Sequence, residues 1–163
     1  MSVLAEVESA NASYATHFAK GELAMPPARR FAVLTCMDAR IDPARALGLE
    51  EGDAHVIRNA GGVVSDDAIR SLAISQAMLG TEEIVLIHHT RCGLLDFTDA
   101  EFADRLEAET GERPQWKVHA FADLEEDVRE GIETLRSSPF IRHKDGIRGF
   151  VYEVESGALR EVV

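Results

Sequence analysis

Short apolar runs, separated by segments with helical periodicity, make up most of the chain. Runs of this length and continuity are typical of strands buried on both faces of a parallel sheet. Near the C-terminus, an apolar segment followed by a Ser156-Gly157 turn predicts an antiparallel hairpin. The pattern therefore predicts strands at residues 31–35, 54–57, 84–87, 147–154 and 159–163.

Capping residues and glycine stops indicate helices between these strands. Ser65 is followed by Asp66 and Asp67, so a capping hydroxyl and two acidic side chains lie at the positive end of a helix dipole. Thr98 is a second expected cap. Helices are predicted at residues 4–20, 43–48, 66–79, 98–111 and 124–136.

Strands that alternate with helices predict an α/β fold. We expect one domain over residues 1–163, with a mostly parallel central sheet of about four strands, an antiparallel C-terminal edge strand and flanking helices. A length of 163 residues, with 45% hydrophobic and 28% charged side chains, fits one soluble globular domain. In such sheets, chemistry gathers beyond the carboxyl ends of the strands.

The charge balance narrows the classes of partner. There are 17 Lys and Arg against 29 Asp and Glu, for a net charge of -12 and no basic cluster, so nucleic acid and anionic membranes are poor partners. The N-terminal residues do not have the pattern of a secretory signal, and no stretch is long and apolar enough to span a bilayer. We therefore expect a cytoplasmic protein whose two cysteines are reduced thiolates or metal ligands.

Those two cysteines lie just beyond the ends of predicted strands. Cys36 begins C-M-D-A-R, and Cys92 ends H-T-R-C, which starts at His89. A lone cysteine after an apolar strand is more often a small buried hydrophobe than a ligand. Two thiolates and an imidazole at neighbouring strand ends, however, form a zinc site with its fourth position open, as catalytic zinc requires. A disulfide is the alternative, but it needs α-carbons within about 7 Å and leaves His89 without a purpose.

The remaining histidines are expected to be structural or on the surface. His88 adjoins His89 on a strand and so faces the opposite way, which favours a packed or hydrogen-bonded role. The sequence offers no reason to choose any of the others as a proton carrier. They are His17, His55, His119 and His143.

Two further groups of residues near the strand ends complete the candidate site. Asp38 and Arg40 are two residues apart, so they can pair; beside zinc, the carboxylate can bind the metal or accept a hydrogen bond from a zinc-bound hydroxide, and the arginine holds it in the second role. The loop with Asn59, Gly61 and Gly62 permits close backbone approach and is expected to line a substrate pocket.

Other enzyme classes do not fit these motifs. Dinucleotide and phosphate-loop glycine patterns are absent, and so is a redox C-x-x-C. A cysteine phosphatase places an arginine six residues after its nucleophile, where this chain has Asp42 and Thr98. Covalent thiol chemistry is therefore not expected.

The motifs C-M-D-A-R (residues 36–40), R-N-A-G-G (58–62) and H-H-T-R-C-G (88–93), in this order and spacing, resemble those of the β-class carbonic anhydrases, in their compact bacterial and archaeal form. The resemblance implies a zinc-dependent lyase that hydrates carbon dioxide reversibly to bicarbonate by a zinc-hydroxide mechanism. One Zn²⁺ per subunit would be bound by Cys36, His89 and Cys92. Asp38 and Arg40 match the family's dyad, and in some members the aspartate is itself a fourth ligand at lower pH.

The resemblance also implies an assembly and alternative activities. Residues 1–28 would form a helical arm that contacts a partner in a homodimer, and tetramers built from such dimers occur. Members with this scaffold hydrolyse carbonyl sulfide or carbon disulfide, so these substrates are an alternative. A non-catalytic zinc-binding protein, with Asp38 closing the site, is another.

Overall fold

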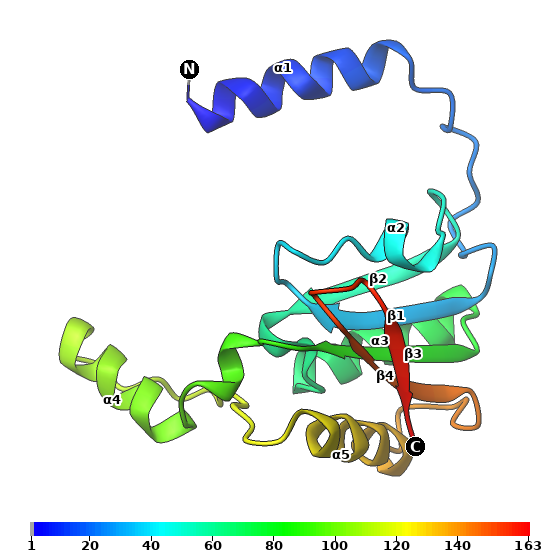
Figure 1. The fold of residues 1–163 in the computed structure, drawn as a ribbon. Helices are drawn as coiled ribbons and strands as arrows, with labels where there is room; N and C mark the ends of the chain where they lie inside the picture. Colours follow the sequence, from blue (N-terminus) through cyan, green and yellow to red (C-terminus); the bar gives the residue numbers. More distant parts are fainter. Residues whose placement is uncertain (1) are drawn as a thin grey trace.

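Five strands form a single sheet over residues 2–163, the part of the chain described by this computed structural model (Figure 1). The first four strands along the chain are parallel, and the last is antiparallel to its neighbour. This confirms the predicted sheet. The strands are β1 (Phe31–Cys36), β2 (Ala54–Asn59), β3 (Glu83–His89), β4 (Ile147–Tyr152) and β5 (Leu159–Val162), in the spatial order β2-β1-β3-β4-β5.

Helices occupy most of the connections between the strands. Ser65 and Thr98 cap two of them, accepting hydrogen bonds from the backbone N–H groups of Ala68 and Glu101, as predicted. Two short 3₁₀ turns follow β2 and β3, η1 (Ala60–Gly62) and η2 (Gly93–Leu95). The α-helices are α1 (Val3–Thr16), α2 (Pro43–Leu47), α3 (Asp66–Leu79), α4 (Asp99–Thr110) and α5 (Leu124–Ser137).

Some predicted limits were wrong by a few residues. Helix α1 ends at Thr16, four residues before the predicted end, because none of its described residues is buried and no packing extends it. Strand β4 ends at Tyr152 because a turn begins at Glu153, whose carbonyl accepts the N–H groups of Ser156 and Gly157.

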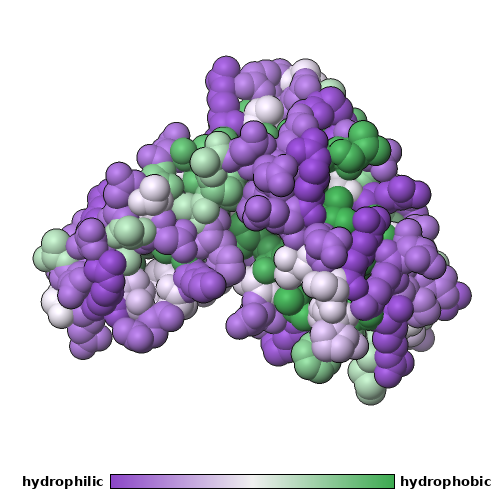
Figure 2. Space-filling model, turned by 90° about the horizontal axis from the view of Figure 1, so that it is seen from below, coloured by the Kyte–Doolittle hydropathy of each residue, from purple (hydrophilic) through white to green (hydrophobic). Residues whose placement is uncertain are grey.

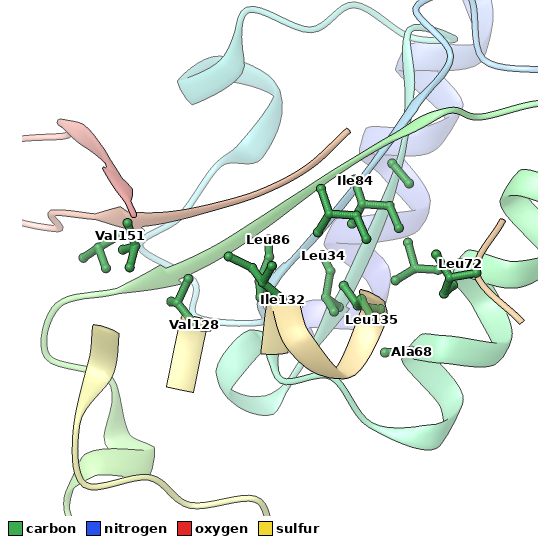
Figure 3. Close-up of a cluster of buried hydrophobic side chains, with 13 residues drawn as sticks. Leu34, Ala68, Leu72, Ile84, Leu86, Val128, Ile132, Leu135 and Val151 are labelled. Atoms are coloured by element: carbon green, nitrogen blue, oxygen red, sulfur yellow. The ribbon is translucent and has the colours of Figure 1, made fainter. Parts of the chain in front are cut away.

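The main core lies on the face of the sheet that α3 and α5 cover. Figure 3 shows Leu34 and Leu86 from the strands in one cluster with Leu72 of α3 and Leu135 of α5. These four side chains are fully buried. Because the same strands carry the candidate ligands at their carboxyl ends, this core fixes the positions of those ends.

Helix α1 lies away from the sheet, at the end of an extended segment (Figure 1). Its apolar residues Val3, Leu4 and Val7 are exposed. Tyr14 donates a hydrogen bond to Glu51 at 2.5 Å, which ties the end of α1 to the rest of the chain. No helix within residues 2–163 has the length and apolar character needed to cross a membrane.

Candidate metal centre and its cavity

The three predicted ligands meet at the carboxyl edge of the sheet. Cys36 is the last residue of β1, His89 is the last residue of β3, and Cys92 immediately precedes η2. One ligand atom from each residue lies within 4.8 Å of the others. All three side chains are buried, and both cysteines are free thiols rather than a disulfide. The fold therefore assembles two sulfurs and one imidazole at a single point.

The imidazole of His89 is oriented as a metal ligand requires. Its Nδ1 lies 2.9 Å from the Thr90 carbonyl oxygen, which can only accept, so the ring proton is at Nδ1. The Nε2 lone pair is then free, and Nε2 is buried without a hydrogen-bond partner among residues 2–163. A buried unpartnered acceptor carries a desolvation cost that a bound cation would remove.

The two thiols also fit a divalent metal. The pKa of Cys36 is lowered to about 4, mainly because the Cys92 thiol donates a hydrogen bond to it. The same interaction raises the pKa of Cys92. The two sulfurs therefore interact at close range, within 4.8 Å of each other. A divalent cation between them would hold both as thiolates, and zinc prefers this set of ligands.

Asp38 and Arg40 form a close pair beside the three ligands. Arg40 donates from Nε to Asp38 Oδ1 at 2.9 Å and from Nη2 to Oδ2 at 2.7 Å, and its backbone N–H donates to Oδ1 at 2.9 Å. These hydrogen bonds hold the pKa of Asp38 well below its usual range. Asp38 Oδ2 lies 3.8 Å from His89 Nε2, so the ionised carboxylate borders the cluster.

Arg58 supports the backbone of the Cys36 segment. Its Nε donates to the Cys36 carbonyl at 3.0 Å, and its Nη2 donates to the Asp38 carbonyl at 2.8 Å. Arg58 was predicted to lie at the start of the glycine loop, with no role assigned to it. Its position at the end of β2, the strand next to β1, was the available signal.

The glycine loop packs directly against the ligand strands. Gly62 has φ of 73°, and a Cβ at this position would lie 2.7 Å from the Cys36 backbone nitrogen. A side chain would therefore push the loop away from the ligand strand. Asn59 donates from Nδ2 to the Val63 carbonyl at 2.8 Å, while its Oδ1 is buried with no partner among the described residues.

A turn from the far end of the chain braces the segment between the second and third ligands. Arg91 has φ of 54°, an uncommon backbone conformation for a residue other than glycine. Glu155 accepts from Thr90 Oγ1 at 2.8 Å and pairs with Arg91 Nε at 2.5 Å. Arg40 Nη2 donates to the Arg91 carbonyl at 3.0 Å, which links this brace to the Asp38–Arg40 pair. The role of Glu155 could not be predicted from the sequence, because no local pattern indicates this contact.

The cluster opens into a cavity of about 560 Å³. Most of the predicted site residues line it, whereas Arg40 and Gly62 do not. Its opposite wall is formed by residues around α4, which projects as a lobe with a hollow beside it (Figure 2). The predicted residues that line the cavity are Cys36, Asp38, Asn59, Gly61, His89 and Cys92. The α4 wall consists of Phe97, Phe102, Trp116, Lys117, Val118 and His119.

Two histidines have different environments in the structure. His88 is buried, with Nε2 2.6 Å from Asp127 Oδ2, in agreement with its expected structural role. His119 was expected to be a surface or locally structural residue, yet it lines the cavity. This position could not be predicted from the sequence, because the segment that carries His119 has no regular structure and is far from Cys36, His89 and Cys92 along the chain.

Comparisons with known proteins agree with this geometry. A family model described as carbonic anhydrase matches residues 31–159. Beta-carbonic anhydrase 1 of Mycobacterium tuberculosis is 51% identical over 99% of both chains. The carbon disulfide hydrolase of an Acidianus species is 37% identical, covering 91% of this chain and 83% of its own. The crystal structure of carbonic anhydrase from Streptococcus mutans superimposes with a TM-score of 0.94 at 45% identity, covering 100% of this chain and 99% of its own.

The fold and the buried Cys-His-Cys cluster thus define a metal-dependent enzyme of the α/β class. This chain belongs to the β-carbonic anhydrase family, the zinc lyases that catalyse carbon dioxide hydration.

Proposed function

We propose that this protein catalyses the reversible hydration of carbon dioxide to bicarbonate, with one zinc ion per subunit held by Cys36, His89 and Cys92. The observation that carries this proposal is the convergence of three buried ligand atoms within 4.8 Å at the base of a cavity. Two thiolates and a neutral imidazole suit zinc, and three protein ligands leave a position for water. Bound zinc would act as a Lewis acid that makes this water a nucleophile near neutral pH.

The chain's own residues then orient and support the reaction. Asp38 accepts a hydrogen bond from the attacking water and so directs an oxygen lone pair at the carbon of carbon dioxide. Arg40 keeps Asp38 ionised and holds its two oxygens through the hydrogen bonds described above. This pairing supports water, rather than Asp38, as the fourth ligand at neutral pH.

Carbon dioxide is linear, uncharged and weakly solvated, so it needs an apolar approach to the metal rather than charged groups. Phe97, Phe102 and Val118 offer such a surface across the cavity from the ligands. We propose that Asn59 and Gly61 complete the pocket on the sheet side, with Gly62 allowing their loop to lie against β1.

Carbon disulfide is the second candidate substrate, because a relative at 37% identity is named for its hydrolysis. It is also linear and apolar, so the same water could attack it. Carbon dioxide ranks first, since the relative at 51% identity is a carbonic anhydrase. A site closed permanently by Asp38 is less well supported, because the carboxylate is bonded to Arg40.

The test is a stopped-flow hydration assay on zinc-analysed protein at two pH values, run beside an assay of hydrogen sulfide release. We expect rapid hydration, faster at the more alkaline pH, with little hydrogen sulfide formed from carbon disulfide. Zinc at full occupancy without hydration at either pH would contradict the proposal. Faster turnover of carbon disulfide than of carbon dioxide would show that carbon disulfide is the preferred substrate.

We also propose a cytoplasmic homodimer in which α1 packs on the partner subunit. This assembly is supported by three exposed apolar residues on α1, which lies away from the sheet of its own subunit: Val3, Leu4 and Val7. Light scattering after chromatography should give twice the chain mass, and Leu4→Glu should shift it towards the monomer. An unchanged mass for this variant would contradict the role of α1.

A further inference from the structure

Hydration of carbon dioxide by one water molecule produces bicarbonate and one proton, so each turnover must move a proton out of the cavity. This inference rests on the proposed function. Asp38 is poorly suited to carry the proton, because both its oxygens already accept hydrogen bonds from Arg40. A group is needed that faces the cavity, has a free lone pair and reaches solvent.

Among the histidines in residues 2–163, two line the cavity, and His89 is one of the three ligands. The other is His119. The ring of His119 makes no hydrogen bond to the described residues, and the residue is half-buried, so both cavity water and bulk water can reach it. Three of the others are engaged elsewhere and the fourth is exposed outside the cavity: His17, His55, His88 and His143.

The backbone that carries His119 is firmly held. Its φ of 61° is in the left-handed region, which histidine adopts more readily than most side chains. Asp99, the first residue of α4, accepts the His119 N–H at 3.2 Å and the Ala120 N–H at 2.7 Å. Phe121 donates its N–H to the Leu94 carbonyl at 3.3 Å, which fixes the segment to the turn after Cys92. A free ring is thus presented from a fixed backbone.

We propose that His119 transfers the product proton from the cavity to the solvent. Its unprotonated ring nitrogen accepts a proton from a cavity water, and that water takes the proton released by the attacking water. The resulting imidazolium then returns the proton to a buffer base outside, which regenerates the neutral ring. Histidine is suited to this exchange because it gains and loses a proton near neutral pH.

Outside the metal centre, the other charged side chain in the cavity lining is Lys117, two residues before His119. Asp99 lies behind the backbone and is already bonded to two N–H groups. The other titratable groups on the cavity wall belong to the metal centre: Cys36, Asp38, His89 and Cys92.

The test compares wild type with His119→Asn, because asparagine tolerates the positive φ and cannot carry the proton. His143→Asn is the matched control, since His143 is exposed and outside the cavity. In dilute buffer we expect kcat of His119→Asn to fall about tenfold, while kcat/KM stays within about twofold of wild type. Added imidazole should restore kcat. Zinc content and the His143→Asn values should match wild type.

Several results would overturn the inference. One is an unchanged kcat of His119→Asn in dilute buffer; another is a fall in kcat/KM that imidazole does not reverse. NMR titration of the His119 ring in zinc-free protein gives a readout independent of activity, and a ring that keeps one protonation state between about pH 6 and 9 would also contradict it. A wild type without hydration activity would remove the proposed function itself, which distinguishes the two failures.

Discussion

The two walls of the cavity are built in different ways. On the sheet wall, Cys36, His89 and Cys92 have exposed fractions of 5%, 0% and 4%, and the strands β1 and β3, which end at Cys36 and His89, pass through the core. On the α4 wall, Trp116 is 60% exposed, and no described residue of α4 is buried. Metal binding requires ligand atoms held within about 0.5 Å of the productive geometry, which packed helices and strands supply better than loops do. A surface that faces an apolar substrate has no such need. Substitutions on the two walls should therefore differ greatly in effect.

The largest effect is expected from Cys36→Ser on the sheet wall. Serine keeps the size of the side chain but loses the thiolate, so the variant should retain little zinc and no hydration activity. Metal analysis of the purified protein and the stopped-flow assay measure this. Trp116→Ala, on the α4 wall, is the comparison and should retain its zinc. Full zinc occupancy in Cys36→Ser would disprove the assigned ligand set.

The next largest effect is expected where the backbone of Gly62 packs against the backbone of Cys36. Gly62→Ala places a Cβ 2.7 Å from the Cys36 nitrogen, so unfolding free energy should fall by about 3 kcal/mol or more. Gly80 is the matched control, because it has φ of 71° but no heavy atom of the described residues within 4 Å of a Cβ. Gly80→Ala should cost only about 1 kcal/mol. Urea unfolding of both variants decides it, and equal losses would refute the steric argument.

Asp38→Ala should keep zinc and lower turnover. Removal of a group that orients a metal-site nucleophile typically costs about 10–100-fold in activity. Metal analysis with kcat/KM for hydration measures the effect, and Asp42→Ala, which alters a nearby acid that caps α2, is the control. An Asp38→Ala variant as active as wild type would remove the proposed role of this carboxylate.

Arg40→Gln should move the acid limb of activity. The hydrogen bond from Arg40 is the main cause of the lowered pKa of Asp38. The carboxylate therefore stays ionised to low pH, and the Asp38–Arg40 pair stops stabilising the folded protein only when the pH falls through that lowered pKa. Without Arg40 the pKa rises towards the ordinary carboxyl value, so protonation and loss of activity begin at higher pH. The pH profile of kcat/KM tests this. A limb at the same pH in both proteins would contradict it.

The smallest effect is expected from Phe102→Ala on the α4 wall. The residue is half-buried and stacks on Phe97 at a centroid distance of 5.2 Å, so the loss in unfolding free energy should be about 1 kcal/mol. Zinc content should be unchanged, with at most a severalfold rise in KM for carbon dioxide. Phe140→Ala, at an exposed site outside the cavity, is the control. Loss of zinc in Phe102→Ala would show that the two walls are not independent.

Local patterns were enough to predict most of the fold and the three residues that meet in the buried cluster. Apolar runs located the strands, and Ser65 and Thr98 marked helix starts, because burial period and capping act over a few residues. Cys36, His89 and Cys92 could be found because parallel strands bring their carboxyl ends to one edge.

Contacts between distant segments could not be predicted in this way. Glu155 meets Arg91, and Arg58 holds the Cys36 carbonyl, through hydrogen bonds that depend on the strand order β2-β1-β3-β4-β5. His119 reaches the cavity only because Asp99 and Leu94 bind its segment. Such contacts produce no periodic or local pattern in the amino-acid sequence.

The amino-acid sequence alone therefore predicted an α/β sheet and a set of residues suited to zinc, since both follow from short-range spacing and from the chemistry of the side chains. Three-dimensional packing decided the rest: the support of the Cys36 carbonyl by Arg58, the exposed α4 wall, and the place of His119 in the cavity lining. The physical reason is that close contacts between remote segments exist only after the strands have taken their places in the sheet.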